Sequence, residues 1–418
     1  MGAEGVLWGQ VSSPTLTRYH GDGSGNALYS PANEATATSY FSAMSPWGLM
    51  GRVSMRPDGS VASRCNIGQT SLQVAANGGD RCYSDTNIDA NGEQKMVYVP
   101  QFCYYCDYVA AHNIVWWVGQ IGDSFTPQAA DGTFTGTPYT FSASDIHPAF
   151  LVDGVAKSGA FISAYEGSYN TNFMNKGVTA LESVSGAVPK VSITKPNLRT
   201  PAENIGTGWE LMTTQINAAL QYLFIIEYGS LNGQTTLGAG NTGAAATITN
   251  TGGTALSGNA SYGSSSTVSP ISYRGIENWW GNIATFIEGV RTDASYHIWI
   301  QPQTRLHTYN DSSTLSSQAY YVDSTSTFPS TTGMQYMLSC YTTTGATGLG
   351  WAFLPSAIGA LSNTYFCDVV AGAAFAYVQT IGGWVTDGLA CGPFAMNHPQ
   401  LYTGTVVYVG GRIQYLPS

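Results

Sequence analysis

The sequence predicts an α+β protein in which short strands predominate and one main helix packs in the core. Three observations favour this class. Short apolar runs alternate with Gly, Asp, Asn and Ser turns, one long stretch has helical periodicity, and the C-terminal part returns to glycine-punctuated strands. A hydrophobic content of 43% is enough for a large core and excludes wholesale disorder.

The first 95 residues are expected to form a β-rich N-terminal region for attachment or assembly, followed by a main domain at 96–418. Within this region, Pro57-Asp58-Gly59 separates two alternating segments. Glycine accepts the positive φ that a tight turn needs, so the pattern predicts a hairpin.

The segment from Gly208 to Gly229 is predicted to be the core helix. Gly229 is suited to end it, and its apolar residues recur at spacings of three and four: Leu211, Ile216, Ala219, Leu220, Leu223 and Ile226. A second, shorter helix is predicted around Thr200 to Ile205, because Pro201 is compatible with a first helical turn.

Two polar insertions are expected, near residues 229–270 and 308–332. Both contain few large apolar side chains and cannot build a core of their own, so we predict surface loops or ribbons that a neighbouring part orders. Between them, residues 273–290 predict a strand-turn-strand unit around Trp279 and Trp280.

The charge pattern excludes several classes of partner. The chain has 15 Lys and Arg against 25 Asp and Glu, a net charge of −10, and only 10% charged residues. Phosphate backbones and anionic membranes are recognised by clustered Lys and Arg, so we expect no nucleic acid and no membrane as partners. No apolar stretch approaches the ~20 residues of a membrane span, and the first residues resemble neither a secretory leader nor a lipidation signal.

Seven cysteines are an odd number and do not describe a disulfide scaffold. Cys103 and Cys106 have the spacing of half a zinc site, but no second ligand pair follows them. We therefore favour buried cysteines on opposite faces of a strand over a metal site.

Six motifs occur in an order that is informative as a set: Met96-Val-Tyr-Val-Pro-Gln-Phe-Cys-Tyr-Tyr, Ile146-His-Pro-Ala-Phe, Ala164-Tyr-Glu-Gly-Ser, the Trp209 to Gly229 segment, Tyr273-Arg-Gly-Ile-Glu-Asn-Trp-Trp-Gly-Asn, and Gly382-Gly-Trp with Gly410-Gly-Arg. This order resembles a family of tailed-phage and prophage structural proteins with a C-type-lectin-like domain. That domain is similar to the variable proteins of diversity-generating retroelements and to formylglycine-generating enzymes. The resemblance spans roughly residues 96–418, and residues 5–55 are loosely similar to the family's N-terminal part.

The resemblance implies a twisted antiparallel sheet, one main helix and a C-terminal face that binds a ligand, commonly a host receptor. It implies a virion protein whose partners are other virion proteins and a host cell-surface glycan or protein. A homotrimer is expected because trimers are common among attachment proteins. The alternative is a purely structural virion subunit without receptor contact.

The resemblance places the ligand-binding residues in the C-terminal variable segment. Aromatic side chains there supply rigid contact area, and Asn, Gln and His supply adaptable hydrogen bonds. A core position is the favoured alternative for Trp384 and for Phe394, and an ordinary exposed loop is the alternative for the residues from Asn397 onward. The candidates are Trp384, Thr386, Asp387, Asn397, His398, Gln400 and Tyr402.

No enzyme chemistry, metal or cofactor is expected. His147 has no accompanying nucleophile motif and is predicted to be structural, and Cys367 and Cys391 lack the pattern of the oxidase relatives. The acidic turn at 85–92 resembles a calcium loop, but Tyr98 stands where the closing Glu is required, so a hydrogen-bonded turn is favoured.

Two charged residues are predicted to be structural. Arg412 is expected to form a buried pair with Glu277 or Glu227 that locks the final strand, and Glu166 is expected to have a similar role.

Overall fold

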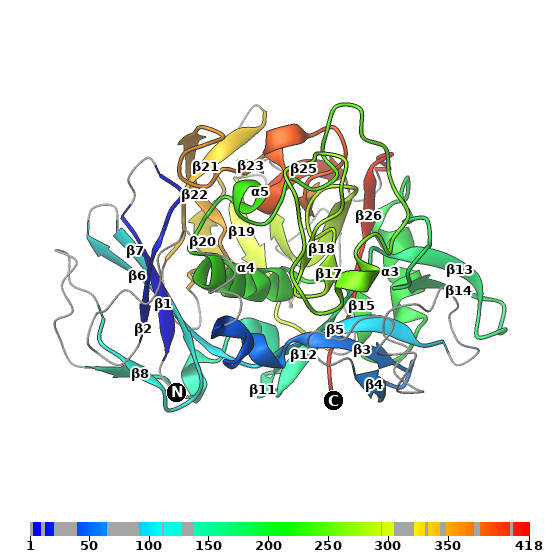
Figure 1. Ribbon diagram of the computed structural model, residues 1–418, viewed down its shortest axis with the longest axis horizontal. Helices are drawn as coiled ribbons and strands as arrows, with labels where there is room; N and C mark the ends of the chain where they lie inside the picture. The colour runs from blue at the N-terminus through cyan, green and yellow to red at the C-terminus, as the bar shows by residue number, and fades with distance from the viewer. Residues whose placement is uncertain are drawn as a thin grey trace.

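Three β-sheets are arranged around the main helix in the computed structural model (Figure 1). The structure describes residues 3–9, 13–20, 40–64, 92–110, 113–127, 138–293, 295–304, 322–330, 333–342, 348–371, 377–401 and 404–418. Within these ranges the chain is rich in strands and has few helices, which agrees with the predicted α+β class. No helix in them is long and apolar enough to span a membrane.

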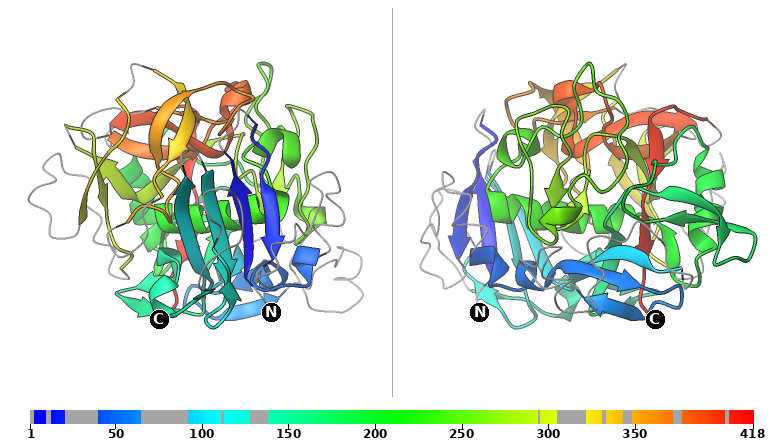
Figure 2. Two further views of the ribbon diagram at one scale, coloured as in Figure 1. Left: turned by 90° about the vertical axis from the view of Figure 1, so that its left-hand side faces the viewer. Right: turned by 45° about the vertical axis from the view of Figure 1, so that its right-hand side comes forward.

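The smallest of the three sheets covers one side of the main helix, and Figure 2 (left) shows its strands in front of that helix. Its order is β2-β1-β7-β6. The strands are β1 (Glu4–Trp8), β2 (Thr17–His20), β6 (Cys103–Ala110) and β7 (Asn113–Gly119).

A six-stranded sheet lies along the lower side in Figure 1, in the order β15-β27-β12-β5-β3-β4. Its strands are β3 (Gly51–Met55), β4 (Val61–Arg64), β5 (Gln94–Pro100), β12 (Gly159–Ser163), β15 (Trp209–Leu211) and β27 (Ile413–Tyr415).

The largest sheet forms the upper part, in the order β20-β19-β18-β24-β25-β23-β21-β22, and β26 (Val409–Gly411) pairs in parallel with β18. Its other strands are β18 (Ala284–Thr292), β19 (His297–Ile300), β20 (Val322–Thr327), β21 (Gln335–Cys340), β22 (Pro355–Ala360), β23 (Val369–Val370), β24 (Tyr377–Gly382) and β25 (Gly392–Leu401).

Short antiparallel pairs complete the strands. They are β8 (Ser124–Phe125) with β9 (Tyr139–Thr140), β10 (Leu151–Val152) with β11 (Val155–Ala156), β13 (Ser168–Phe173) with β14 (Val178–Glu182), and β16 (Ser272–Tyr273) with β17 (Ile276–Glu277). The last pair and β18 confirm the strand-turn-strand unit predicted around Trp279 and Trp280, both of which are buried.

The main helix α4 (Thr214–Tyr228) ends as predicted but begins later. Gly229 has a φ of 61°, and its N–H donates to Ile225 O at 2.8 Å. The predicted start at Gly208 is wrong because β15 (Trp209–Leu211) pairs with the C-terminal strand β27. Thr213 then caps the helix by accepting the N–H of Ile216 at 3.4 Å.

The second helix α3 (Lys195–Glu203) begins five residues before the predicted Thr200. Thr194 caps it, and Pro201 lies inside the helix rather than in its first turn, which corrects the prediction. Two cations of α3 hold it to β18: Lys195 Nζ lies 2.8 Å from Glu288 Oε2, and Arg199 Nη2 lies 2.7 Å from Glu288 Oε1.

The expected division after residue 95 falls inside β5 (Gln94–Pro100). Strands from both sides of it share two sheets, because β3 pairs with β5 and β1 pairs with β7. The hairpin predicted within the N-terminal region is confirmed: β3 and β4 are antiparallel, Gly59 has a φ of 84°, and Ser60 N–H donates to Asp58 Oδ1 at 2.8 Å.

The insertion at 229–270 is a long irregular segment with two short helical turns, α5 (Gly233–Thr236) and a 3₁₀ turn at Ala255–Ser257. In Figure 1 it runs from α5 across the upper middle of the molecule. The second insertion, expected at 308–332, contains a strand instead of a continuous loop, since β20 (Val322–Thr327) pairs with β19. Its residues 308–321, 331 and 332 lie outside the described ranges.

Candidate functional site

The turn that joins β24 to β25 carries the first three candidate residues. Trp384 and Asp387 are half-buried, and Thr386 is exposed. Trp384 N–H donates to Asp387 Oδ2 at 3.2 Å, and the Cys391 thiol donates to Trp384 O at 3.4 Å. The Asp387 carboxylate and the Cys391 thiol therefore stabilise the turn through hydrogen bonds within it. Because Trp384 is half-buried, the alternative that it is a core residue is confirmed only in part.

Neighbouring segments hold this turn from outside. Gly388 N–H donates to Thr242 O at 2.9 Å, and Gln234 Nε2 donates to the carbonyls of Gly388 at 2.9 Å and Cys391 at 2.6 Å. Val385 N–H donates to Asn282 O at 3.2 Å. The insertion at 229–270 thus supplies part of the support, which sequence reasoning did not anticipate.

Thr386 has a φ of 75°, in the left-handed region that β-branched residues rarely adopt. Such a conformation persists only where the surroundings fix it, and strained residues gather at functional sites. The hydrogen bonds of Trp384 and Gly388 on either side fix this turn. The Thr386 side chain is consequently presented to solvent in a defined direction.

Trp384 does not stand alone on the surface. Its ring lies 5.9 Å from the ring of half-buried Tyr408, with an angle of 39° between the planes. Thr405 and Val407, which flank this part of the chain, are exposed, Val407 to 59%. The two rings and the exposed side chains around them form the aromatic face, which we define as Trp384, Thr386, Asp387, Thr405, Val407 and Tyr408.

The remaining candidates continue along or beyond β25. Asn397 and Gln400 are paired in register with Thr380 and Val378 of β24, and His398 lies between them in the strand. The side chains of these three residues, and all of Tyr402, lie outside what the structure describes. Phe394 is 2% exposed, which agrees with the favoured core position.

A buried polar network supports the face from below. Asn282 donates to Glu166 Oε2 at 2.6 Å, and Asn278 donates to the same oxygen at 3.2 Å. Burial raises the pKa of Glu166 to about 7, against the lowering effect of the nearby Arg412 guanidinium. Since Asn282 also accepts the Val385 N–H, the network reaches the candidate turn directly.

Arg412 is buried and contacts Glu277, but through the backbone of Glu277 and not through its carboxylate, which corrects the predicted pair. Arg412 Nη2 donates to the backbone carbonyls of Glu277 and Asn278, the latter at 2.6 Å. The Glu277 carboxylate instead accepts the N–H groups of Gly252 at 2.7 Å and Thr254 at 2.5 Å, and so fixes the insertion at 229–270.

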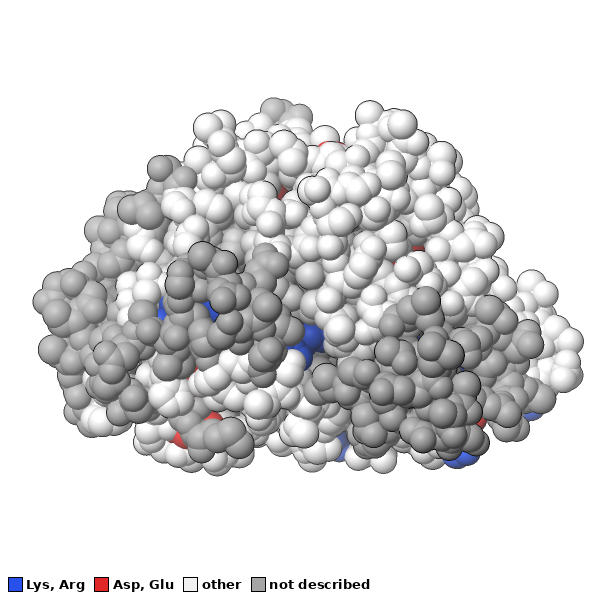
Figure 3. Space-filling model, in the orientation of Figure 1, with Lys and Arg blue, Asp and Glu red and all other residues white. Residues whose placement is uncertain are grey.

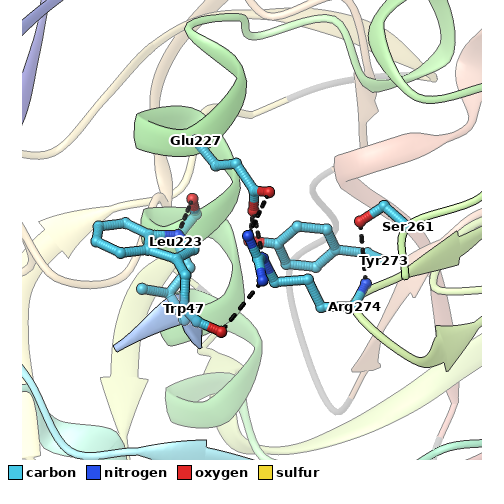
Figure 4. Close-up of polar contacts among 6 residues, drawn as sticks. All are labelled: Trp47, Leu223, Glu227, Ser261, Tyr273 and Arg274. Carbon is cyan, nitrogen blue, oxygen red and sulfur yellow. Dashed lines mark hydrogen bonds and ion pairs between the residues drawn. The ribbon is translucent and has the colours of Figure 1, made fainter. Parts of the chain in front are cut away.

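Glu227, the other partner considered for Arg412, pairs with Arg274 (Figure 4). Arg274 Nη2 and Nε lie 2.7 Å from the two carboxylate oxygens, and the Tyr273 hydroxyl donates to the same carboxylate at 3.1 Å. Arg274 also donates to Trp47 O at 3.1 Å. This pair joins the main helix to the 3₁₀ turn at 47–49 and to β16.

His147 lies in the core among aromatic rings, as a structural residue would. Its Nδ1 accepts the Ala149 N–H at 3.2 Å, and its Nε2 lies 3.3 Å from Trp351 O. Burial lowers the pKa of His147 to about 3. Because the side chain is fully buried, it has no contact with solvent.

The five cysteines in the described ranges carry free, buried thiols: Cys103, Cys106, Cys340, Cys367 and Cys391. Cys103 and Cys106 lie in β6, as the favoured interpretation has it. Burial raises the pKa of Cys103 and of Cys367 to about 12. In those ranges no three His, Cys, Asp or Glu side chains are placed to hold a metal ion, and the acidic turn at 85–91 lies outside them.

Among solved structures, the chain is similar to the Major Tropism Determinant U1 variant, with a TM-score of 0.27 and 12% sequence identity. The match covers 88% of this chain and 71% of that chain. At this TM-score the similarity supports no conclusion on fold or function. No family model and no curated protein matches the chain.

Proposed function

We propose that this protein is a non-enzymatic phage virion subunit of a tail fibre, baseplate or capsid decoration. In this proposal it binds the host cell surface through the C-terminal face of a C-type-lectin-like domain. The observation that carries the proposal is the turn at 383–391, which presents exposed Thr386 and half-buried Trp384 and Asp387. Hydrogen bonds within the turn, and from the insertion at 229–270 and Asn282, hold it in place. Rigid presentation of a few aromatic and polar side chains lowers the entropy cost of binding.

The ordered motifs between Met96 and Arg412 support the assignment to a virion, through the resemblance that they carry. The burial of the candidate nucleophiles and bases supports the proposal that the protein is not an enzyme. The described thiols are buried, and burial keeps His147 neutral among aromatic rings. A nucleophile or general base needs access to substrate and a pKa suited to its task.

The experiment is binding of the purified protein to a panel of bacterial envelope extracts, measured by biolayer interferometry. We compare the parent with Trp384→Ala and with a variant in which Asn397, His398, Gln400 and Tyr402 are all Ala. Truncating a central aromatic contact is expected to weaken binding about tenfold or more. Val155→Ala is the matched control, because Val155 is 56% exposed and its strand β11 lies at the opposite end of the molecule (Figure 1).

Binding that the control retains and both test variants lose, while their circular dichroism is unchanged, supports an attachment protein. If the parent binds no extract but assembles with other particle proteins, the purely structural subunit replaces the proposal. The homotrimer remains a prediction, and mass photometry of the purified protein tests it, since a stable monomer at micromolar concentration would contradict it.

A further inference from the structure

Charged side chains are almost absent from the chain segments that build the upper part of the molecule. Residues 229–273 and 324–367 contain no Lys, Arg, Asp or Glu, and residues 369–411 contain one, Asp387. Figure 3 shows the consequence, because the described atoms of the upper surface are nearly all white. The neutral surface is thus concentrated in the part that carries the aromatic face.

The charges that the chain does have are often buried. Glu166, Glu227, Glu277, Glu288, Arg274 and Arg412 are each at most 3% exposed. Lys190 is the cation whose backbone lies against Gly410 of β26, and its ammonium lies 5.0 Å from the centre of the Tyr169 ring. The aromatic face itself includes no Lys or Arg, and the Lys190 ammonium lies over the Tyr169 ring of β13.

The side chains that the aromatic face does present are two rings, hydroxyls, an exposed valine and one carboxylate. The hydroxyls are those of Thr386 and Thr405, both of which are exposed. Aromatic faces attract C–H groups and apolar ring surfaces, while hydroxyls and a carboxylate accept or donate hydrogen bonds to other hydroxyls. This combination fits a ligand that has an apolar ring face and many neutral hydroxyl groups.

We propose that the ligand of the aromatic face is an uncharged carbohydrate, whose sugar ring packs on Trp384 and Tyr408 and whose hydroxyls bond to Thr386 and Asp387. This inference rests on the proposed attachment function. An acidic polysaccharide or a phosphorylated lipid headgroup is recognised through Lys and Arg, which the described part of the face lacks. A neutral glycan needs no countercharge, and its binding has little long-range electrostatic component.

The first test identifies the ligand class in an envelope extract that the parent binds. Portions of the extract are treated with periodate, which cleaves sugar diols, or with proteinase K, which removes exposed protein. Loss of binding after periodate and retention after proteinase K is the expected result. Loss after proteinase K alone identifies a protein receptor and overturns the carbohydrate inference, while the attachment function stands.

The second test asks whether the carbohydrate is uncharged. Affinity for the extract is measured from about 50 to about 500 mM NaCl. A change of less than about twofold is expected, because the proposed contact contains no ion pair that salt could weaken. A decrease of more than about tenfold would show an anionic ligand and overturn the inference.

Two variants locate the contact. Trp384→Ala is expected to weaken binding about tenfold or more, and Trp384→Phe to restore most of the affinity, because the stacking surface is retained. Lys190→Gln should leave the affinity unchanged, whereas a clear loss in this variant would show that a cation takes part and overturn the inference. No binding by the parent to any untreated extract contradicts the attachment function itself, so the two failures are distinguishable.

Discussion

The aromatic face and the buried polar network beneath it use charge in opposite ways. The network places carboxylates and guanidinium groups where water is excluded, as in Glu166, Glu277 and Arg412. The face contains one carboxylate, Asp387, and its outermost side chains are neutral. The link between them is Asn282, which donates to Glu166 and accepts from Val385.

This difference shows how a segment with few apolar residues can be ordered. A buried charge is costly unless it is paired or hydrogen-bonded, and a carboxylate can accept several N–H groups at once. Glu277 uses its two oxygens to hold Gly252 and Thr254, so the insertion at 229–270 is fixed without a core of its own. Charges inside the molecule therefore allow the surface above them to be neutral and polar.

The largest effect is expected from breaking a buried pair. Glu227→Ala removes the carboxylate that accepts from both Arg274 and Tyr273, and leaves a buried guanidinium without its countercharge. Urea denaturation should show a loss of about 3–5 kcal/mol in the free energy of unfolding. Arg56→Ala is the control, because its side chain is 45% exposed and 3.9 Å from Glu93, and a change within about 0.5 kcal/mol is expected. A loss below about 1 kcal/mol for Glu227→Ala would contradict a charge-dependent scaffold.

The next largest effect is a loss of stability at acidic pH. The pKa of His147 is lowered from 6.5 to about 3 by burial, so the folded state keeps the ring neutral where the unfolded chain binds a proton. The stability that depends on neutral His147 is complete above pH 6.5 and decreases as the pH falls towards 3. Between pH 7 and pH 5 the loss from this group should be about 2 kcal/mol.

The measurement is the free energy of unfolding of the parent and of His147→Asn over that pH range. The variant is less stable at pH 7 because it leaves a cavity, but its stability should change less between pH 7 and pH 5. Parallel curves for the two proteins would show that His147 does not produce the acid sensitivity.

A smaller effect, an increase in the free energy of unfolding, is expected for a substitution on the aromatic face. Thr386→Gly relieves the left-handed conformation at a φ of 75° and should raise the free energy of unfolding by about 0.5–1 kcal/mol. Thr405→Gly is the control, since no positive φ is found there, and it should be neutral or slightly destabilising. If Thr386→Gly is the more stable protein yet binds envelope extracts less well, the Thr386 side chain contributes to binding at a cost in stability.

The smallest effect should follow from adding charge to the face. Thr405→Lys introduces an ammonium at an exposed position, and its free energy of unfolding should stay within about 0.5 kcal/mol of the parent. The comparison predicts that the face tolerates a gained charge, whereas the interior does not tolerate a lost partner. A large destabilisation by Thr405→Lys, measured by thermal denaturation, would contradict it.

Local patterns predicted several elements correctly. The Gly229 end of α4 and the hairpin at Gly59 follow from single glycines that accept positive φ, and the buried strand around Cys103 follows from local composition. The start of α4 was wrong because β15 pairs with β27, a strand about 200 residues later in the chain. No local sequence pattern predicts a strand partner this far away in the chain.

The candidate site was predicted only in outline. The sequence singled out Trp384, Thr386 and Asp387 as candidate contacts, and the structure places them on one solvent-facing turn. It did not single out Tyr408, since the ring contact with Trp384 depends on β26 lying beside β18. Nor did it reveal the support from Gln234 and Asn282, because such hydrogen bonds depend on how distant loops meet.

The sequence by itself determined the α+β class, the apolar main helix and the scarcity of charge, because these depend on composition and on short-range periodicity. Tertiary structure decided where the few charges lie and which neutral side chains remain outside. Arg412 donates to the carbonyls of Glu277 and Asn278, and Glu227 pairs with Arg274, because packing selects partners by position and not by residue type. A chain can encode how many charges it has, but only its folding separates a charged interior from a neutral face.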